Sequence, residues 1–444
     1  MSEGNKSNPF GFDPEEIRRM LEQMLGGQGA GVNAEGAQFF GQIFSAFQGG
    51  SHSDDGIDWS VARKSALETL SQATKPSAAS SEEYRAALLQ AITPAMLWLD
   101  EATAIGSTPH APRVIDRVEW VTASVDTWVQ FAAPVADSVA LAMRASLAEQ
   151  IPEEMREMVG GATKILERIA GTIFASQLGS VIGRLAQEVL AGGDIAVPVV
   201  SGEAHAGGTF VLENITFFGA DLDISTTDIA LYLAVRELAF ARLFRHAKWL
   251  RPHVLSAITE YAQGITLDTS QLQDLAHDFD PAHPEGVNEL LSSGALIPPR
   301  TEQQEQALAR LGHMLALIGG WVDAVTDAAT KNLPAAPAIA EMIRRKSAVG
   351  GPAEQVFGTL VGLELRPRKL REACELWALI ADRGDIQLRD SLWDHPDLLP
   401  TIAEVENHGA LLERLGLGGG AGAATAENDL DDDLRKLLRG DFDR

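Results

Sequence analysis

The 444-residue sequence is short of cysteine and of long apolar runs, and each shortage excludes a class of protein. Its one cysteine, Cys374, permits no disulfide within the chain and no zinc site built from several thiolates. Such low cysteine content fits a reducing compartment, so we expect a cytoplasmic protein. No window of about 20 uncharged apolar residues occurs, which predicts that no helix spans a membrane. No basic stretch before an apolar run marks an export signal.

Positive charge is also scarce: 36 Lys and Arg residues face 62 Asp and Glu residues, a net charge of −26. A field of that sign repels nucleic-acid phosphates and anionic lipid head groups. We therefore expect neither nucleic acid nor a membrane surface among the partners of this protein.

Common phosphate-binding and hydrolase motifs are missing as well. The sequence has no GxxxxGKS or GxxxxGKT loop, no GxGxxG between a strand and a helix, and no GxSxG. The glycine-rich stretch 416–422 lies in acidic surroundings and is interpreted as a linker. The ten histidines form no HxH or HxxxH pair, so none is expected to be one of two metal ligands on a helical face.

What the sequence does contain is helical periodicity. Apolar residues recur every three or four positions through 57–190, 226–265, 301–331 and 334–346, and prolines such as Pro94 and Pro134 are expected to punctuate these helices. The stretch 195–217 is instead rich in β-branched residues and glycine, which predicts short strands at about 195–200 and 209–217. The sequence therefore predicts a mainly α fold, with one large domain over 57–410 and a small β insertion near 195–217.

Both ends of the chain differ from this domain. Residues 1–56 are interpreted as a flexible N-terminal arm with a short amphipathic helix, either weakly ordered or able to dock on a partner. Residues 411–444 are interpreted as a Gly/Ala linker and an acidic amphipathic tail. The apolar stripe of that tail consists of Leu430, Leu434, Leu437 and Leu438. A helix of this length is marginal by itself, because isolated helices below ~12–15 residues are seldom stable.

The helix predicted at 228–250 and several blocks around it resemble an actinobacterial zincin-like metallopeptidase family. The run is DIALYLAVRELAFARLFRHAKWL, and the blocks DWSVARK, LWLDEAT, GWVDAV and GGPAEQVFGTLVGLELRPRK extend the similarity over most of 57–405. Members of this family carry labels such as "putative hydrolase" or "deazaflavin cofactor biosynthesis associated". The resemblance implies a zincin-like helical domain whose former active-site helix is 228–250.

The resemblance also implies where a metal site would lie. A zincin binds zinc through HExxH, whose two imidazoles hold the metal while the glutamate between them activates its water. Arg236 and Phe240 stand in the two histidine positions here, and Glu237 keeps that of the general base. Gly319 stands where a later helix would supply the third ligand, and Asp323 keeps the place of the acid that supports the first histidine.

None of the three ligand positions carries a metal donor, because arginine is cationic and phenylalanine has no lone pair. His246 has metzincin spacing from 236 and 240, but a lone histidine is not expected to bind zinc. A guanidinium reaches further than an imidazole, so Arg236 is expected to bond Asp323, Glu237 or both at about 2.7–3.2 Å. Phe240 is expected to fill the space of the second histidine.

Three interpretations of these positions remain open: a salt-bridge network in place of a lost metal, a cleft that binds a peptide or small molecule, and residual metal-free hydrolysis. We predict a non-catalytic cytosolic protein that binds an unknown protein or peptide partner. Glu237 is then a vestigial general base, and no cofactor is expected. The alternative is an active zinc-dependent metallopeptidase with unrecognised ligands, and only this alternative requires zinc.

Overall fold

The computed structural model describes residues 57–418 except 151–155, 221, 266–299, 350–357, 359–361 and 363–368, and it leaves out the side chains of 142–167, 169 and 347–349. All described residues belong to one unit, Ser53–Arg444. The arm predicted at 1–56 with its helix, and the tail beyond Gly418, lie outside the described residues.

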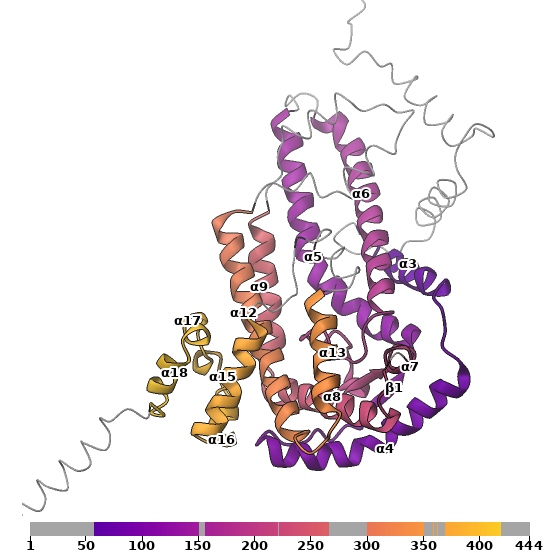
Figure 1. Cartoon of the computed structure of the whole chain (residues 1–444). Helices are drawn as coiled ribbons and strands as arrows, with labels where there is room; N and C mark the ends of the chain where they lie inside the picture. The colour runs from indigo at the N-terminus through magenta and orange to yellow at the C-terminus, as the bar shows by residue number, and fades with distance from the viewer. Residues whose placement is uncertain are drawn as a thin grey trace, which may run out of the picture. The chain divides into compact units, whose positions relative to one another are not determined.

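Helices make up most of the described chain, which confirms the predicted mainly α fold (Figure 1). The longer helices are α3 (Ser60–Ser71), α4 (Ala78–Ala102), α5 (Arg117–Gln150), α6 (Arg156–Leu185), α7 (Leu212–Ala220), α8 (Thr226–His246), α9 (Leu250–Gln263), α12 (Glu302–Ala329), α13 (Ala336–Val349) and α15 (Leu370–Arg383). The shorter ones are η2 (Glu203–His205), α16 (Ile386–Ser391), η3 (Pro396–Leu398), α17 (Ile402–Glu406) and α18 (His408–Arg414).

Three helix boundaries differ from the predicted ones. Pro94 and Pro134 lie inside α4 and α5 and do not end them. A proline removes one backbone hydrogen bond from a helix, and the packing of a long helix against its neighbours can outweigh that loss. α18 runs to Arg414, so the helical part continues past the predicted domain end at 410.

The predicted small β element near 195–217 exists, but the strand bounds predicted for it are wrong. The strand predicted at 209–217 is only three residues long, β2 (Thr209–Val211), and α7 follows it directly. Residues 195–200 form turns and irregular chain instead of a strand. β2 pairs in parallel with β1 (Arg113–Ile115), a strand that the sequence analysis did not predict. The β-branched composition of this stretch reflects burial, because Val197 and Val199 are buried outside any strand just as Val211 is buried in β2.

Helix α8 lies among α4, α12 and α13 and contacts all three. The hydroxyl of Ser225 caps its first turn by accepting the N–H of Asp228 at 3.1 Å. Thirteen of its 21 residues are buried, as expected for a helix that is apolar nearly all round. This central position places Arg236, Glu237 and Phe240 inside the protein.

Helix α12 is the second helix that carries the candidate site. Thr301 and Gln304 form a capping box at its start, with reciprocal bonds of 3.2 and 2.9 Å. By length and composition α12 is the one described helix that could cross a membrane, although no membrane-spanning helix was predicted. Inside the protein, 78% of the most apolar stretch of this helix is buried. Core helices of soluble proteins are often as long and as apolar as this one.

Candidate functional site at helices α8 and α12

The five positions named by the resemblance lie on two helices that pack against each other. α8 carries Arg236, Glu237 and Phe240, and α12 carries Gly319 and Asp323 one turn apart. Because residues three or four apart share one face of a helix, each helix can present its set to a common space.

The guanidinium of Arg236 lies between two carboxylates. Its Nη1 donates to Oδ1 of Asp194 at 3.4 Å, and its Nε is 3.5 Å from Oδ1 of Asp323. Only 12% of the Arg236 side chain and 9% of the Asp323 side chain is exposed. The expected pairing of Arg236 with Asp323 therefore exists as an ion pair, but it is longer than the predicted hydrogen bond, and Nε makes no hydrogen bond to the described residues.

The charges in this cluster support one another. Burial would lower the pKa of Arg236, but the neighbouring Asp323 and Asp194 raise it above the ordinary value for arginine. Burial raises the pKa of Asp323, and the charge of Arg236 opposes that rise. The cation is therefore firmly protonated, and its charge favours the ionised form of Asp323.

Asp194 is the member of this cluster that the sequence analysis missed. It lies in the irregular chain after α6, and its Oδ2 accepts the N–H of Leu190 at 2.6 Å. In the sequence, Asp194 is a lone acid after two glycines in an apolar stretch. That pattern does not indicate that its partner is Arg236, 42 residues away.

Glu237 makes different contacts from those expected. Its Oε1 accepts the N–H of Thr209 at 2.7 Å, and its Oε2 accepts the N–H of Gly193 at 2.9 Å. The residue is only 3% exposed. Burial raises the pKa of its carboxyl to about 8, although both N–H bonds act to lower it. The candidate base therefore holds the backbone together at β2 and at the 192–194 turn.

Close backbone contacts fill the space beside α8. A Cβ at Gly193 would lie 2.6 Å from Cγ of Phe240, and one at Gly208 would lie 3.0 Å from Cγ of Glu237. Gly208 also has a φ of +106°, where a side chain is strained. Phe240 is 5% exposed, and it packs against Phe244 with ring centroids 4.6 Å apart. Phe240 therefore occupies its space as a packed core residue.

Gly319 faces a neighbouring helix. Within 4 Å, a Cβ at this position would meet only Cδ1 of Leu370, at 2.8 Å, and one at Gly320 would meet Ala373 at 2.7 Å. Both contacts come from α15, which packs closely on α12. The structure therefore places Asp323 beside Arg236, and it places the predicted third-ligand position against α15.

These residues do not fit a zinc ion. The Arg236 cation occupies the first ligand position, Phe240 offers no lone pair, and the backbone holds both oxygens of Glu237. Across the part of the chain that the structure describes, no group of three or more His, Cys, Asp or Glu side chains could hold a metal. His246 pairs with Asp394 at 2.8 Å.

Comparison with known proteins decides the family. Residues 57–411 match the family described as Zincin-like metallopeptidase. The chain belongs to this family. A crystal structure from Chloroflexus aurantiacus, described as "a putative hydrolase with a novel fold", is similar with a TM-score of 0.52 and 21% identity over 81% of this chain and 99% of that one. At that identity the similarity shows the fold alone, and no curated protein matches.

We expect Glu237 to make the stability of this zincin-like protein depend on pH. Because the pKa of Glu237 is about 8 in the folded protein and near 4.5 in the unfolded chain, the folded state binds this proton more tightly. The stability that protonated Glu237 adds to the folded state is fully present below about pH 4.5, and it is lost as the pH rises through about 8. Between these values the free energy of unfolding should fall by up to about 1.4 kcal/mol per pH unit.

Urea unfolding at pH 5 and pH 8 measures this effect. Glu237→Gln, which cannot titrate, should show a smaller fall than the wild type. The exposed Glu203 offers a matched control, because Glu203→Gln makes the same chemical change away from the site. Equal falls in the wild type and in Glu237→Gln would contradict the prediction.

Proposed function

We propose that this zincin-family chain has lost zinc-dependent hydrolysis and acts in the cytosol by binding a protein or peptide partner. The observation that carries the proposal is the guanidinium of Arg236 between Asp194 and Asp323, in the place where the family's first histidine would bind the metal. A positive charge there would repel a zinc ion, and two carboxylates already compensate that charge.

The state of the candidate base supports the same proposal. A general base in a zincin needs a free carboxylate oxygen directed at the metal-bound water. Both oxygens of Glu237 instead accept backbone N–H groups, and glycine backbone covers the helix beside it. Glu237 is then a vestigial base that has become a structural residue, and no cofactor is required.

Composition supports the expected partners and location. The net charge of −26 disfavours nucleic acid and anionic membranes. Burial raises the pKa of the one thiol, Cys374, to about 12, so it remains a protonated, unreactive group. An unreactive free thiol is compatible with a reducing cytoplasm.

The alternative is an active zinc-dependent metallopeptidase whose ligands lie outside these five positions. The family itself favours this alternative. Its ligands would have to include side chains outside the described residues, where His277 and His283 are two of the candidates. The two proposals differ first in their need for metal.

We predict that the purified full-length chain contains far less than one zinc per molecule, because no described residue set offers the ligands. Elemental analysis measures the content, and thermal unfolding with and without a chelator tests whether metal supports the fold. The melting temperature should not change. One zinc per chain, or a clear fall in melting temperature with chelator, would support the alternative, as would zinc-dependent cleavage of a peptide library.

A further inference from the structure

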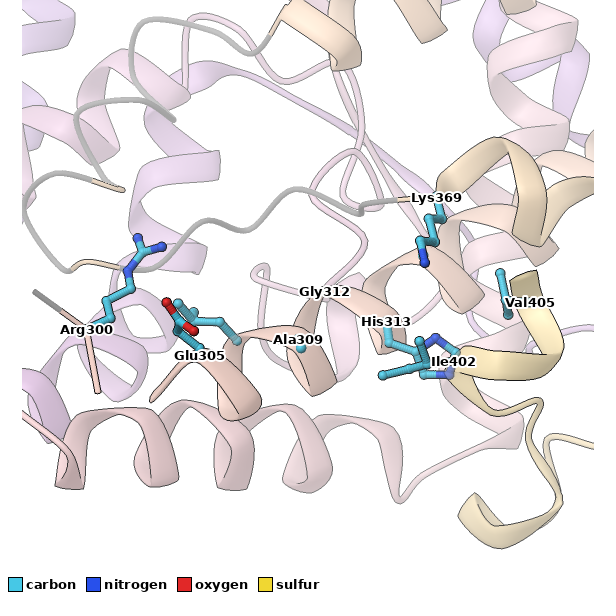
Figure 2. Close-up of a pocket in the computed structure, with 10 residues that line it drawn as sticks. Arg300, Glu305, Ala309, Gly312, His313, Lys369, Ile402 and Val405 are labelled. Atoms are coloured by element: carbon cyan, nitrogen blue, oxygen red, sulfur yellow. The ribbon is translucent and has the colours of Figure 1, made fainter. Parts of the chain in front are cut away.

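A pocket of about 480 Å³ lies along the first half of α12 (Figure 2). Its floor comes from one face of that helix and includes Leu308, Ala309, Gly312 and Ala316. These residues are apolar and mostly small, so a second helix could approach α12 closely. The pocket lies at the N-terminal side of Gly319 on α12 and involves none of the five positions discussed above.

The far wall of this groove is apolar and partly exposed. Ile402 and Val405 of α17 form it, and Ile402 is 42% exposed. Leu398, in the turn just before α17, is also 42% exposed. Large exposed apolar side chains beside a groove are typical of a surface that another segment covers.

Cations stand at the two ends of the groove. Figure 2 shows Arg300 and Glu305 at one end and Lys369 at the other. Lys369 also pairs with Glu406 at the end of α17. The groove therefore combines an apolar floor with one cation at each end, Arg300 beside Glu305 and Lys369 paired with Glu406.

We propose that this groove binds the acidic C-terminal segment of the same chain, residues 429–439, as a helix laid along α12. In a helix, Leu430, Leu434, Leu437 and Leu438 would form one apolar face. The interval from Leu430 to Leu438 equals that from Leu308 to Ala316, about 12 Å in each helix. An amphipathic helix in an apolar groove is a common form of peptide recognition.

The charges of the segment match those of the groove. At about 100° per residue, Asp431 and Asp433 would flank the leucine face at the N-terminal end of the segment, so one end of the groove, at Lys369, would meet them. The basic residues Arg435, Lys436 and Arg439 would lie on the outer face, toward solvent. Opposite charges of this kind favour binding of a helix with acids beside its apolar face over binding of one with basic residues there.

The segment is also attached close to the groove. Arg414 of α18 pairs with Glu404 of α17 at 2.7 Å, which anchors the end of the described chain beside the wall of the groove. Eleven residues separate Gly418 from Leu430, and a Gly-rich chain of that length spans roughly 18 Å. A tether of this length gives a high effective concentration, so a helix that is marginal alone can be stabilised by docking.

Hydrogen exchange of the full-length chain, followed by mass spectrometry, tests the proposal. Amides of 430–439 should exchange at least about tenfold more slowly in the wild type than in a Leu434→Asp, Leu437→Asp variant. Ala309→Glu places a carboxylate on the groove floor at an exposed helical position, and it should remove the same protection. Gln303→Glu adds one negative charge at an exposed site of α12 outside the groove, and it should leave the protection unchanged.

Three results would overturn the proposal. The first is fast exchange of 430–439 in the wild type. The second is protection that persists in Ala309→Glu, which would place the segment elsewhere. The third is protection that falls on dilution, which would show that the segment binds a second copy of the chain. None of these results depends on the metal content of the protein, so they test the groove separately from the proposed loss of hydrolysis.

Discussion

Asp323→Ala should lower the free energy of unfolding by roughly 3–5 kcal/mol, as measured by urea denaturation. The substitution would leave Arg236 in a nearly buried site with Asp194 as its remaining carboxylate. Because this second partner remains 3.4 Å away, we expect a loss toward the lower end of that range.

Asp327 provides a matched control for this prediction. It lies one turn further along α12 and pairs with Arg344, but both of these side chains are more than 40% exposed. Exposed ion pairs contribute little, so Asp327→Ala should cost less than about 1 kcal/mol. Arg236→Met combined with Asp323→Leu and Asp194→Asn removes all three charges of the cluster, and it should be more stable than Asp323→Ala alone. If Asp323→Ala and Asp327→Ala lower the free energy of unfolding equally, the buried ion pair contributes no more to stability than the exposed one.

A variant that combines Arg236→His, Phe240→His and Gly319→Glu should bind zinc. The substitutions restore the donor set of the family on a scaffold that belongs to it. Position 319 faces α15, so the tip of Leu370, whose Cδ1 lies 2.8 Å from a Cβ built there, must move before the new glutamate can turn toward the metal. The expected result is about one zinc per chain and a melting temperature that a chelator lowers.

The restored variant should bind zinc without regaining peptidase activity. Thr209 and Gly193 would still hold the two oxygens of Glu237, which leaves no base free for a metal-bound water. The control lacks Gly319→Glu and should bind zinc more weakly, because it has one ligand fewer. A folded triple variant that takes up no zinc would contradict the assignment of positions 236, 240 and 319.

The sequence by itself determined the helices and the elements that carry the candidate site. The periodic apolar residues of 226–246 and 301–331 are local signals, because the face that a helix buries repeats every 3.6 residues. The resemblance to zincins pointed to Arg236 and Asp323, whose ion pair the structure contains. The identities of these two side chains were enough to predict the pair, because a buried cation requires a carboxylate and the resemblance placed Asp323 near Arg236.

Only the tertiary structure decided the remaining partners. Asp194 and the N–H groups of Gly193 and Thr209 meet α8 across 28 to 44 residues of sequence. A backbone N–H has no signature in a sequence, because every residue except proline carries one. The same reason explains the missed pairing of β1 with β2, nearly 100 residues apart. Which backbone groups come within hydrogen-bond distance depends on how the helices pack and how turns such as 192–194 bend.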